Sequence, residues 1–328
     1  MLEPDANGLY CPAGGFYVDP WLPVDRAVIT HAHTDHARQG CGSYLTVEDG
    51  EALLRARMAE EAVVESVPYG ASLLIGGVRV SFHPAGHIRG SAQVRIEHAG
   101  EIWVFSGDYK LAPDPTCPPF ETVRCHTFVT ESTFGLPIFR WRDAPDIIAE
   151  IEAWWRANRE AGRPSLLFAY PLGKAQRILA GVDAAIGPIY THGAVEKLNA
   201  IYKYAGVMLA PTTHVSATDK GDWSGALILA PPSANATPWA RRFGNASRAL
   251  ASGWMRIRGA RRRRTLDRGF VLSDHADWPA LNQAIAASGA GRVLVTHGYR
   301  APLVQWLSEQ GRHAESLETH FGETGEEE

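Results

Sequence analysis

A short segment of this chain concentrates side chains of the kind that bind metal ions. The segment reads Thr30-His31-Ala32-His33-Thr34-Asp35-His36, and it follows an apolar, β-branched run, residues 26–30, that is typical of a strand. Imidazole nitrogens and carboxylate oxygens are ligands that first-row metals such as zinc accept. One histidine alone would more often be an ordinary core or surface residue, but four such side chains together favour a metal site. The first two histidines can point to one side and the aspartate and last histidine to the other, so the spacing allows two metals.

Other polar residues that could join this site also stand at the ends of short β-branched runs. The runs are residues 101–105, 127–130, 269–274 and 292–296, and the residues that follow them are Asp108, Glu131, His275 and His297. Strands that lie side by side in a sheet bring their ends together, so ligands from distant parts of the chain can converge. Together with the first run, these segments predict a metal site built on a sheet.

Length and composition limit the kind of protein that carries this site. The chain has 328 residues and a mass of 35.8 kDa. Domains mostly run about 100–200 residues, so we expect two cores, or one core with a large insertion. Hydrophobic residues make up 45% and charged residues 21%, which excludes a disordered, collagen-like or coiled-coil chain. No apolar run approaches the roughly 20 residues of a membrane-spanning helix, so we expect no membrane partner. The acidic N-terminal segment does not look like a secretory signal, and we expect a cytoplasmic protein.

Charge and cysteine usage narrow the expected partners and chemistry. The formal charge of −4 means that any contact with nucleic acid must come from a local patch. One candidate patch is the arginine-rich stretch 241–268, which includes the run Arg261-Arg262-Arg263-Arg264. A charge run is usually only a solvated face, but this one stands just before His275, where a phosphodiester backbone would need a basic surface. The four cysteines form no CxxC pair, so we expect buried free thiols rather than disulfides or a cysteine zinc site.

Two amphipathic segments predict helices that pack against these strands. The first begins after Asp143, an N-cap acid, and ends by Gly162. The second, residues 49–64, places Leu53 and Leu54 above a charged face. Both apolar stripes are expected in the core rather than against a cofactor.

The metal segment resembles the HxHxDH signature of the metallo-β-lactamase superfamily. His87 in Pro84-Ala85-Gly86-His87 is similar to the next metal histidine of that superfamily, and Asp108 to the carboxylate that bridges both metals. Asp19 resembles the early aspartate that orients the metal loop. Three further segments resemble the A, B and C motifs of the β-CASP nucleases, the branch that cuts DNA or RNA: Glu131-Ser132-Thr133-Phe134-Gly135, Ser273-Asp274-His275 and Thr296-His297-Gly298. Gly173-Lys174-Ala175-Gln176 is similar to the G-R/K-A-Q element of that branch.

The resemblance implies a role for each of these residues. One metal would be held by His31, His33 and His87, the other by Asp35, His36 and His297, with Asp108 shared between them. Two divalent cations, zinc or manganese, would bind a bridging hydroxide that attacks the scissile phosphate, so Asp35 and Asp108 also count as catalytic. His275, beside the metals but not bound to them, would protonate the departing sugar oxygen. Glu131 would hold that histidine in one tautomer and favour its charged form.

Contacts to the substrate are expected from basic residues elsewhere in the chain. Lys174 and Gln176 could cradle a phosphate at a helix start, although such a turn is also ordinary punctuation between a strand and a helix. Arg256, Arg258 and Arg261 are candidate contacts to backbone phosphates. Three other histidines match no element of the family. We expect core or surface roles for His192 and His214, and the spacing of His83, four residues before His87, does not match the motif.

The resemblance also implies a fold class and a function. The expected fold is α/β, with an αββα metallo-β-lactamase sandwich formed by residues 1–137 and 269–328 and a compact β-CASP-like α/β domain, residues 138–268, inserted into it. The expected function is that of a two-metal DNA nuclease, an exonuclease of DNA repair similar to bacterial ligase-associated exonucleases, with a DNA ligase and a helicase as partners.

Two other functions are open at this point. An RNA-processing nuclease of the same branch is the main alternative, although the segment between Glu131 and His275 is shorter than the insertion of the RNA-processing members. A small-molecule hydrolase such as a thioesterase or lactonase is less favoured, because a small ester needs no basic surface beside the metals.

Overall fold

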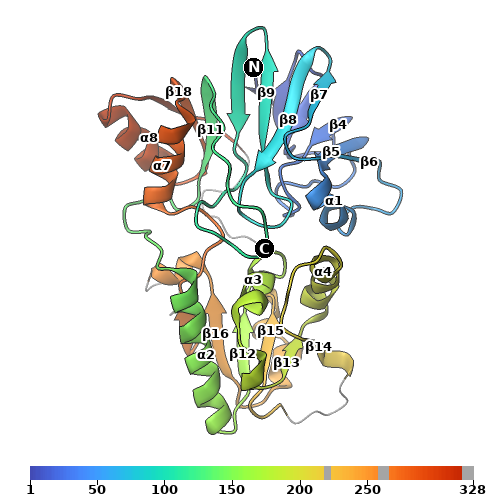
Figure 1. The fold of residues 1–328 in the computed structure, drawn as a ribbon, viewed down its shortest axis with the longest axis vertical. Coiled ribbons are helices and arrows are strands. Elements are labelled where there is room, and N and C mark those ends of the chain that lie inside the picture. Colours follow the sequence, from blue (N-terminus) through green and yellow to red (C-terminus); the bar gives the residue numbers. More distant parts are fainter. Residues whose placement is uncertain (218–222, 258–265, 320–328) are drawn as a thin grey trace. The chain divides into compact units, whose positions relative to one another are not determined.

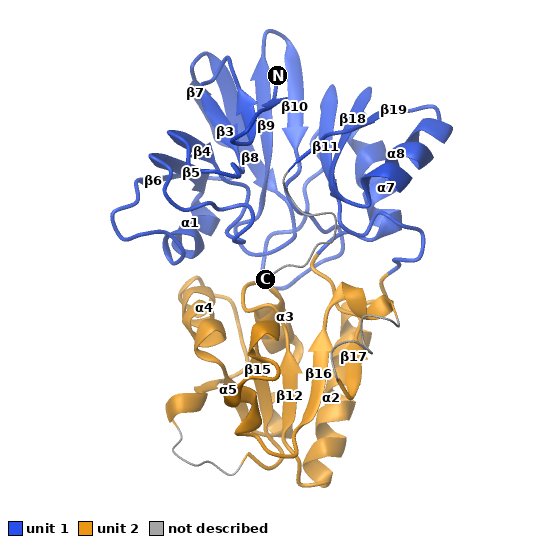
Figure 2. Cartoon of the chain, turned by 180° about the vertical axis from the view of Figure 1, so that it is seen from behind, with its two compact units in different colours: residues 1–140, 275–327 blue, residues 141–274, 328 orange. Residues whose placement is uncertain are grey.

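The computed structural model describes residues 1–217, 223–257 and 266–319 of the chain. They form two compact units, shown in different colours in Figure 2. Unit 1 is assembled from two stretches, Met1–Arg140 and the described residues from His275 onward, whereas unit 2 is the single stretch Trp141–Asp274. In sequence, unit 2 is therefore inserted between the two parts of unit 1.

Unit 1 contains two sheets, of which the first has six strands in the order β1-β2-β3-β4-β5-β6. The strands are β1 (Glu3–Pro4), β2 (Leu9–Cys11), β3 (Phe16–Val18), β4 (Arg26–Val28), β5 (Ser43–Val47) and β6 (Val64–Val67). Strands β3 to β6 run parallel, whereas β1 to β3 are paired antiparallel. Helix α1 (Glu48–Arg55) contacts β5 and β6 and buries Leu53 and Leu54.

The second sheet of unit 1 has seven strands in the order β19-β18-β11-β10-β9-β8-β7. These are β7 (Ser72–Ile75), β8 (Val78–Pro84), β9 (Ala92–His98), β10 (Glu101–Phe105), β11 (Thr127–Ser132), β18 (Arg292–Gly298) and β19 (His313–Ser316). Strands β7 to β10 form an antiparallel meander, and β10, β11, β18 and β19 run parallel to one another.

Successive side chains along the strands of the second sheet point to opposite faces, and each face packs into its own apolar core. On β10, Trp103 and Phe105 belong to the apolar cluster that the two sheets share, together with Phe16 and Val28 of the first sheet. Val104, between them, belongs instead to a cluster with helices α7 (Trp278–Ser288) and α8 (Arg300–Glu309). Unit 1 is therefore a pair of facing sheets with helices packed on them, which confirms the expected α/β sandwich (Figure 1).

Unit 2 is built on one six-stranded sheet in the order β14-β13-β15-β12-β16-β17, and all its strands run parallel. The strands are β12 (Ser165–Phe168), β13 (Ile189–Thr191), β14 (Thr213–His214), β15 (Leu227–Ala230), β16 (Ser247–Ala251) and β17 (Arg268–Phe270). The helices in the described residues of unit 2 are α2 (Ala144–Glu160), α3 (Lys174–Gly181), α4 (Gly193–Tyr204) and α5 (Pro238–Arg241). Short 3-10 turns are η1 (Ala184–Ile186), η2 (Val215–Ala217), η3 (Pro232–Ala234) and η4 (Gly253–Arg256).

The central strands of this sheet, β15 and β12, are apolar at every position except Ser165, because both faces of the sheet are covered. Leu167 and Leu229 pack in a cluster with Trp155 of α2, while their neighbours Leu166 and Ile228 pack in a second cluster on the opposite face. Continuous apolar strands of this kind are typical of parallel sheets buried on both sides.

The two helices expected from the sequence have different outcomes. Helix α2 begins after the N-cap residue Asp143, with a proline in its first turn, as predicted. The helix expected over residues 49–64 is wrong in its length, because α1 ends at Arg55. The β-branched pair Val63 and Val64 pairs with β5 instead, where the Tyr44 amide donates to the Val63 carbonyl.

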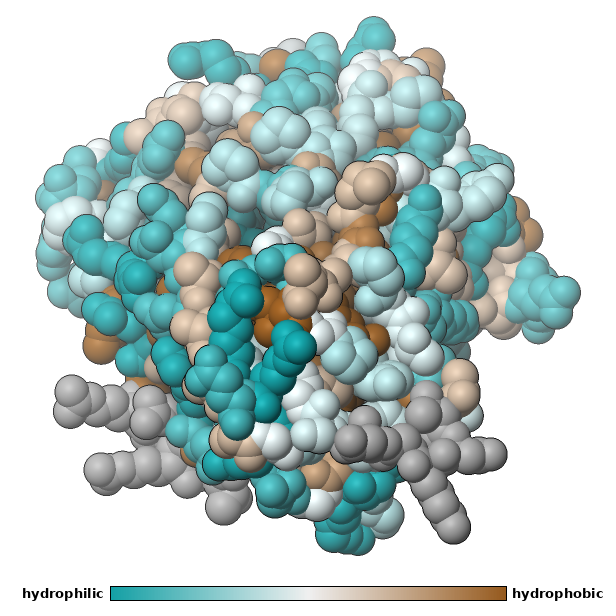
Figure 3. Space-filling model, turned by 60° about the horizontal axis from the view of Figure 1, so that its bottom comes forward, coloured by the Kyte–Doolittle hydropathy of each residue, from teal (hydrophilic) through white to brown (hydrophobic). Residues whose placement is uncertain are grey.

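The cysteines are free thiols and most of them are buried, as expected from the sequence. The four cysteines are free; Cys11, Cys41 and Cys125 are buried and Cys117 is half-buried. The face in Figure 3 is mainly hydrophilic, with apolar residues in small patches. None of the helices in the described parts of the chain combines the length and apolar character needed to cross a bilayer.

Candidate metal centre

Three of the seven predicted ligands, together with Glu131, lie at one edge of the second sheet of unit 1. Strands β10, β11 and β18 are parallel, and β8 runs the same way because β9 is antiparallel to both β8 and β10. The carboxyl ends of these four strands therefore share an edge. His87 follows β8, Asp108 follows β10, and β11 and β18 carry Glu131 and His297. His31 follows β4 of the facing sheet.

The expectation that one sheet carries all five strands is wrong in two places. Strand β4 belongs to the first sheet of unit 1, and β17, which precedes His275, pairs with β16 in the sheet of unit 2. His275 itself belongs to unit 1. The segment that joins β17 to His275 contains no strand in the described residues, so the chain leaves one sheet before it delivers this histidine.

Two glycines fix the turns that present His87 and Asp108. Gly86 has a φ of +72°, and a Cβ on it would collide with the Lys110 carbonyl oxygen. Gly107 has a φ of +53°, and a Cβ there would lie 2.8 Å from the Thr30 side chain. Both turns therefore depend on residues without a side chain.

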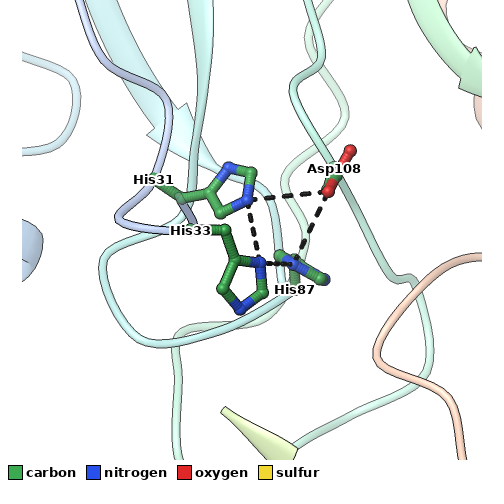
Figure 4. A group of neighbouring side chains, drawn as sticks. All are labelled: His31, His33, His87 and Asp108. Atoms are coloured by element: carbon green, nitrogen blue, oxygen red, sulfur yellow. Dashed lines mark hydrogen bonds and ion pairs between the residues drawn. The ribbon is translucent and has the colours of Figure 1, made fainter. Parts of the chain in front are cut away.

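The first group of metal-type side chains contains His31, His33, His87 and Asp108. One ligand atom from each lies within 4.8 Å of the others. His33 Nδ1 is 3.1 Å from His31 Nε2 and 3.1 Å from His87 Nε2. Asp108 Oδ2 is 3.6 Å from His31 Nε2 and 3.8 Å from His87 Nε2. Figure 4 shows the three rings converging on one space beside the carboxylate.

A second group shares the same aspartate and contains His36 and His297. His36 Nε2 lies 3.4 Å from Asp108 Oδ2, and His297 Nε2 lies 3.1 Å from Asp108 Oδ1. Asp35 is in neither group, but its carboxylate, 53% exposed, lies 3.6 Å from His36 Nε2. The structure thus brings six of the predicted ligands into two groups joined by Asp108, and it places Asp35 beside the second.

Asp19 supports the second group through a contact with His36. This fully buried residue accepts hydrogen bonds from the Thr30 amide at 2.8 Å and from the Thr30 hydroxyl at 2.6 Å. Its Oδ2 lies 2.7 Å from His36 Nδ1, which leaves Nε2 as the nitrogen that faces Asp108. Its φ of +43° is unusual for a residue other than glycine. Such strain is most often found at functional sites, where surrounding contacts hold it in place.

A third group places His275 between the metal-type side chains and Glu131. Glu131 Oε2 is 2.9 Å from His275 Nδ1, and Glu131 Oε1 accepts a hydrogen bond from the Tyr109 amide at 2.8 Å. The ring centroids of His275 and His87 lie 4.6 Å apart. The Phe134 ring contacts His275 edge to face, with the centroids 5.8 Å apart. Both carboxylate oxygens of Glu131 are therefore engaged, and the His275 ring is fixed on several sides.

Electrostatics in these groups favour bound cations. Burial, and then the neighbouring His36, lower the pKa of His31 well below its ordinary value. Burial also acts on His36, but the carboxylates of Asp108, Asp35 and Asp19 outweigh it and hold its pKa well above the ordinary value. Burial would raise the pKa of Asp108, yet attraction to His36 and other site histidines holds it well below the ordinary value. A neutral imidazole and an ionised carboxylate are the forms that ligate metals, and His31 and Asp108 are held in these forms. The carboxylates that favour a proton on His36 would also attract a divalent cation, which would displace that proton on binding. The donor set therefore fits divalent cations.

The structure describes three of the five residues expected to contact substrate, and all three belong to unit 2. Lys174 and Gln176 are 2% and 0% exposed in unit 2, and both contact other side chains of that unit. Arg256 is exposed at the end of η4. Arg258 and Arg261 lie outside the described residues, as does the rest of the run to residue 264.

Two threonines of the site were not singled out from the sequence. Thr30 Oγ1 lies 3.0 Å from His31 Nδ1, and Thr296 Oγ1 lies 3.1 Å from His297 Nδ1. Each hydroxyl can fix the tautomer of the histidine that follows it, so that Nε2 faces the site. The repeated Thr-His pair at two strand ends was the available signal.

Comparison with known proteins adds to this geometry. No protein-family model matches the chain. It is 30% identical over 312 residues, 94% of its length, to a probable DNA ligase of Opitutus terrae, and 25% identical over 217 residues, 55% of its length, to an RNase J-like protein of Methanocaldococcus jannaschii. The chain spans only 30% and 50% of these two relatives. A protein of unknown function from Enterococcus faecalis shares the fold, with a TM-score of 0.56 at 11% identity over 82% of this chain and 74% of that one.

The alignments with these two relatives support the metallo-β-lactamase superfamily, whereas the structural similarity supports the fold alone. They do not single out a branch, because one relative is a probable DNA ligase and the other an RNase J-like protein. The convergence of His31, His33, His36 and His87 on Asp108 is the geometry on which a function can be argued.

Proposed function

We propose that this chain is a two-metal nuclease of the β-CASP branch that hydrolyses phosphodiester bonds in DNA. The observation that carries the proposal is the position of Asp108 between the two histidine groups, with the Glu131–His275 pair beside them. Its Oδ2 lies 3.6 Å from His31 Nε2 and 3.4 Å from His36 Nε2, and its Oδ1 lies 3.1 Å from His297 Nε2. A shared carboxylate suits two metals that act on one phosphate.

In this proposal the chain's own residues divide into ligands and a general acid. His31, His33 and His87 would hold one cation, Asp35, His36 and His297 would hold the other, and Asp108 would be shared between them. When bound, zinc or manganese would supply Lewis acidity at the phosphate and a water of lowered pKa. Asp19 orients His36 through its contact with Nδ1.

His275 supplies the proton that the leaving group needs. Because Glu131 faces Nδ1, the proton to be transferred is the one on Nε2. As water adds to phosphorus, the bond from phosphorus to the sugar oxygen breaks, and that oxygen takes the Nε2 proton, which solvent later replaces. Glu131 stabilises the charged form of the ring before transfer.

The choice of DNA rests on similarity rather than on the site. The alignment with the probable DNA ligase runs over nearly the whole chain, which favours DNA as the polymer. On that basis we propose an exonuclease that trims strand ends in DNA repair, with a DNA ligase and a helicase as partners in the cytoplasm. The similarity to an RNase J-like protein favours an RNA-processing nuclease as the second candidate. The compact unit Trp141–Asp274 supports the assignment of residues 138–268 to an inserted β-CASP-like domain, between metallo-β-lactamase parts 1–137 and 269–328.

The test is degradation of matched DNA and RNA strands, labelled separately at each end, by protein reconstituted with zinc or manganese. We expect stepwise loss from one end of DNA. Asp108→Ala should abolish cleavage and lower the bound metal, whereas His275→Ala should keep its metals and lose turnover by about a hundredfold or more. His83→Ala is a matched control, because this histidine pairs with Ser81 and Glu121 outside the three groups.

Each other outcome has a defined meaning. Preferred cleavage of RNA would promote the second candidate. Loss of metal from the His275 variant would refute the division between ligands and general acid. Activity on neither polymer would refute the nuclease proposal and leave a small-molecule hydrolase.

A further inference from the structure

A buried ionic cluster in unit 2 holds the two residues that directly precede His275. Asp274 is 2% exposed, and its two carboxylate oxygens meet different cations. Oδ1 lies 3.3 Å from Arg177 Nη1, and Oδ2 lies 3.2 Å from Lys174 Nζ. The same Arg177 nitrogen donates to the Ser273 carbonyl at 2.5 Å. The segment is therefore held both by a side chain and by its main chain.

The two cations are themselves held in place by the start of α3. Lys174 and Arg177 are three positions apart and lie on the same face of the helix. The first turn is closed by Gln176, whose Oε1 accepts from the Gly173 amide at 2.8 Å. The Lys174 ammonium also lies 4.3 Å from the centre of the Tyr170 ring.

Such a cluster is not explained by stability alone. Taking charged side chains out of water costs free energy that their mutual attraction often only offsets. Replacing a buried ion pair with apolar residues is frequently neutral or stabilising. A buried pair does restrict the chain to one arrangement, and here the restricted residues are Ser273 and Asp274.

We propose that Lys174 and Arg177 are positioning residues for His275. They fix Ser273 and Asp274 in one conformation, so that the next residue presents its ring to Glu131 in one orientation. This inference rests on the proposed function, in which His275 is the general acid. It gives Lys174 a role in place of the phosphate contact expected from the sequence.

The test compares two substrates that differ in their need for a general acid. Cleavage of DNA requires protonation of a sugar oxygen, whereas thymidine 5′-(4-nitrophenyl phosphate) releases a nitrophenolate that leaves without a proton. For Lys174→Met and Arg177→Met, we expect kcat on DNA to fall about ten- to a hundredfold, with KM and bound metal unchanged. On the nitrophenyl ester, kcat should stay within about threefold of wild type. Lys174→Arg should recover most of the loss.

The matched control is Arg156→Met, which removes an exposed arginine of unit 2 that pairs with Glu152 and Asp183. It should leave both substrates unaffected. An equal loss on both substrates, a loss of metal, or unchanged cleavage of DNA would each overturn the inference. If Lys174→Met does not fold, Lys174→Gln, which retains a donor, takes its place with the same expectations.

A second measurement does not depend on activity. In the zinc-loaded full chain, the ring signal of His275, assigned with His275→Ala, should be single and sharp in wild type and broadened or split in the Lys174 and Arg177 variants. An unchanged signal would overturn the inference. If wild-type protein cuts neither polymer, the proposed function fails, and this spectrum alone decides whether the cluster positions the ring.

Discussion

Replacing Asp19 with asparagine should weaken the binding of one metal and spare the other. Asparagine has the same shape and tolerates a positive φ, so the φ of +43° at this position adds no new strain. One amide oxygen can still accept from the Thr30 amide. The amide nitrogen, however, would face His36 Nδ1 in place of Oδ2 and would favour a proton on Nε2. A protonated Nε2 cannot ligate a metal.

The size of this effect follows from the role of such supporting contacts. Loss of a group that orients a metal-binding histidine typically costs 10- to 100-fold in metal affinity, or about 1.4–2.8 kcal/mol. We expect that loss only at the site built on His36 and His297. The other site, built on His31, His33 and His87, has no described contact with Asp19 other than through Thr30.

Competition against a chelator of known affinity measures both sites in one titration. The matched control is Asp5→Asn, because Asp5 also accepts from two amides and a hydroxyl, but on the exposed surface of unit 1. The variant at Asp19 should show one site at wild-type affinity and one weakened site, and the control should show two unchanged sites. Two sites at wild-type affinity in the Asp19 variant would refute the reasoning, as would an equal loss at both.

Three further changes have defined outcomes. Glu131→Gln should retain both metals and lower kcat by about a hundredfold, measured as turnover beside metal content, because His275 loses the carboxylate that stabilises its charged form. Burial raises the pKa of Cys125 to about 11, so only a small fraction of this thiol is ionised at pH 8. Because the thiolate is the reactive form, Cys125 should react with Ellman's reagent on the order of a hundredfold more slowly than a free thiol at that pH. Its rate should rise about tenfold per pH unit below that pKa, and mass spectrometry of the labelled peptide would detect any faster reaction. Neutralising Arg261 to Arg264, which lie outside the described residues, should weaken binding to all DNA sequences and reduce the dependence of affinity on salt concentration. An unchanged salt dependence would mean that this run is an ordinary solvated charge cluster that does not contact DNA.

The candidate metal ligands could be predicted from the sequence because a short stretch of residues is enough to predict where a strand ends. A β-branched run followed by histidine or aspartate marks a place where a sheet delivers a side chain, and His31, Asp108 and His297 all follow this rule. The helix after Asp143 was readable for the same reason, since its cap and apolar period are contained in one short window.

What the sequence could not provide were contacts between distant segments. The backbone of Asp19 adopts its unusual φ because Thr30 and His36 hold it, and neither contact leaves a mark near residue 19. Lys174 looks like an exposed helix start until Asp274, a hundred positions later in the chain, is seen to pair with it. The helix over residues 49–64 was overestimated because pairing with β5 outweighs helical periodicity at Val64.

The order of the chain sets the order in which these parts can form during synthesis on the ribosome. Unit 2 is one continuous stretch and has all its strands available before His275 has been made. Strand β11 of unit 1 must wait for its neighbour β18, which supplies His297 and is synthesised after the whole of unit 2. Until then β11 presents an unpaired edge, which is a site for mispairing and aggregation. His297 is thus the last of the predicted ligands to be synthesised, so a nascent chain that lacks β18 carries an incomplete centre.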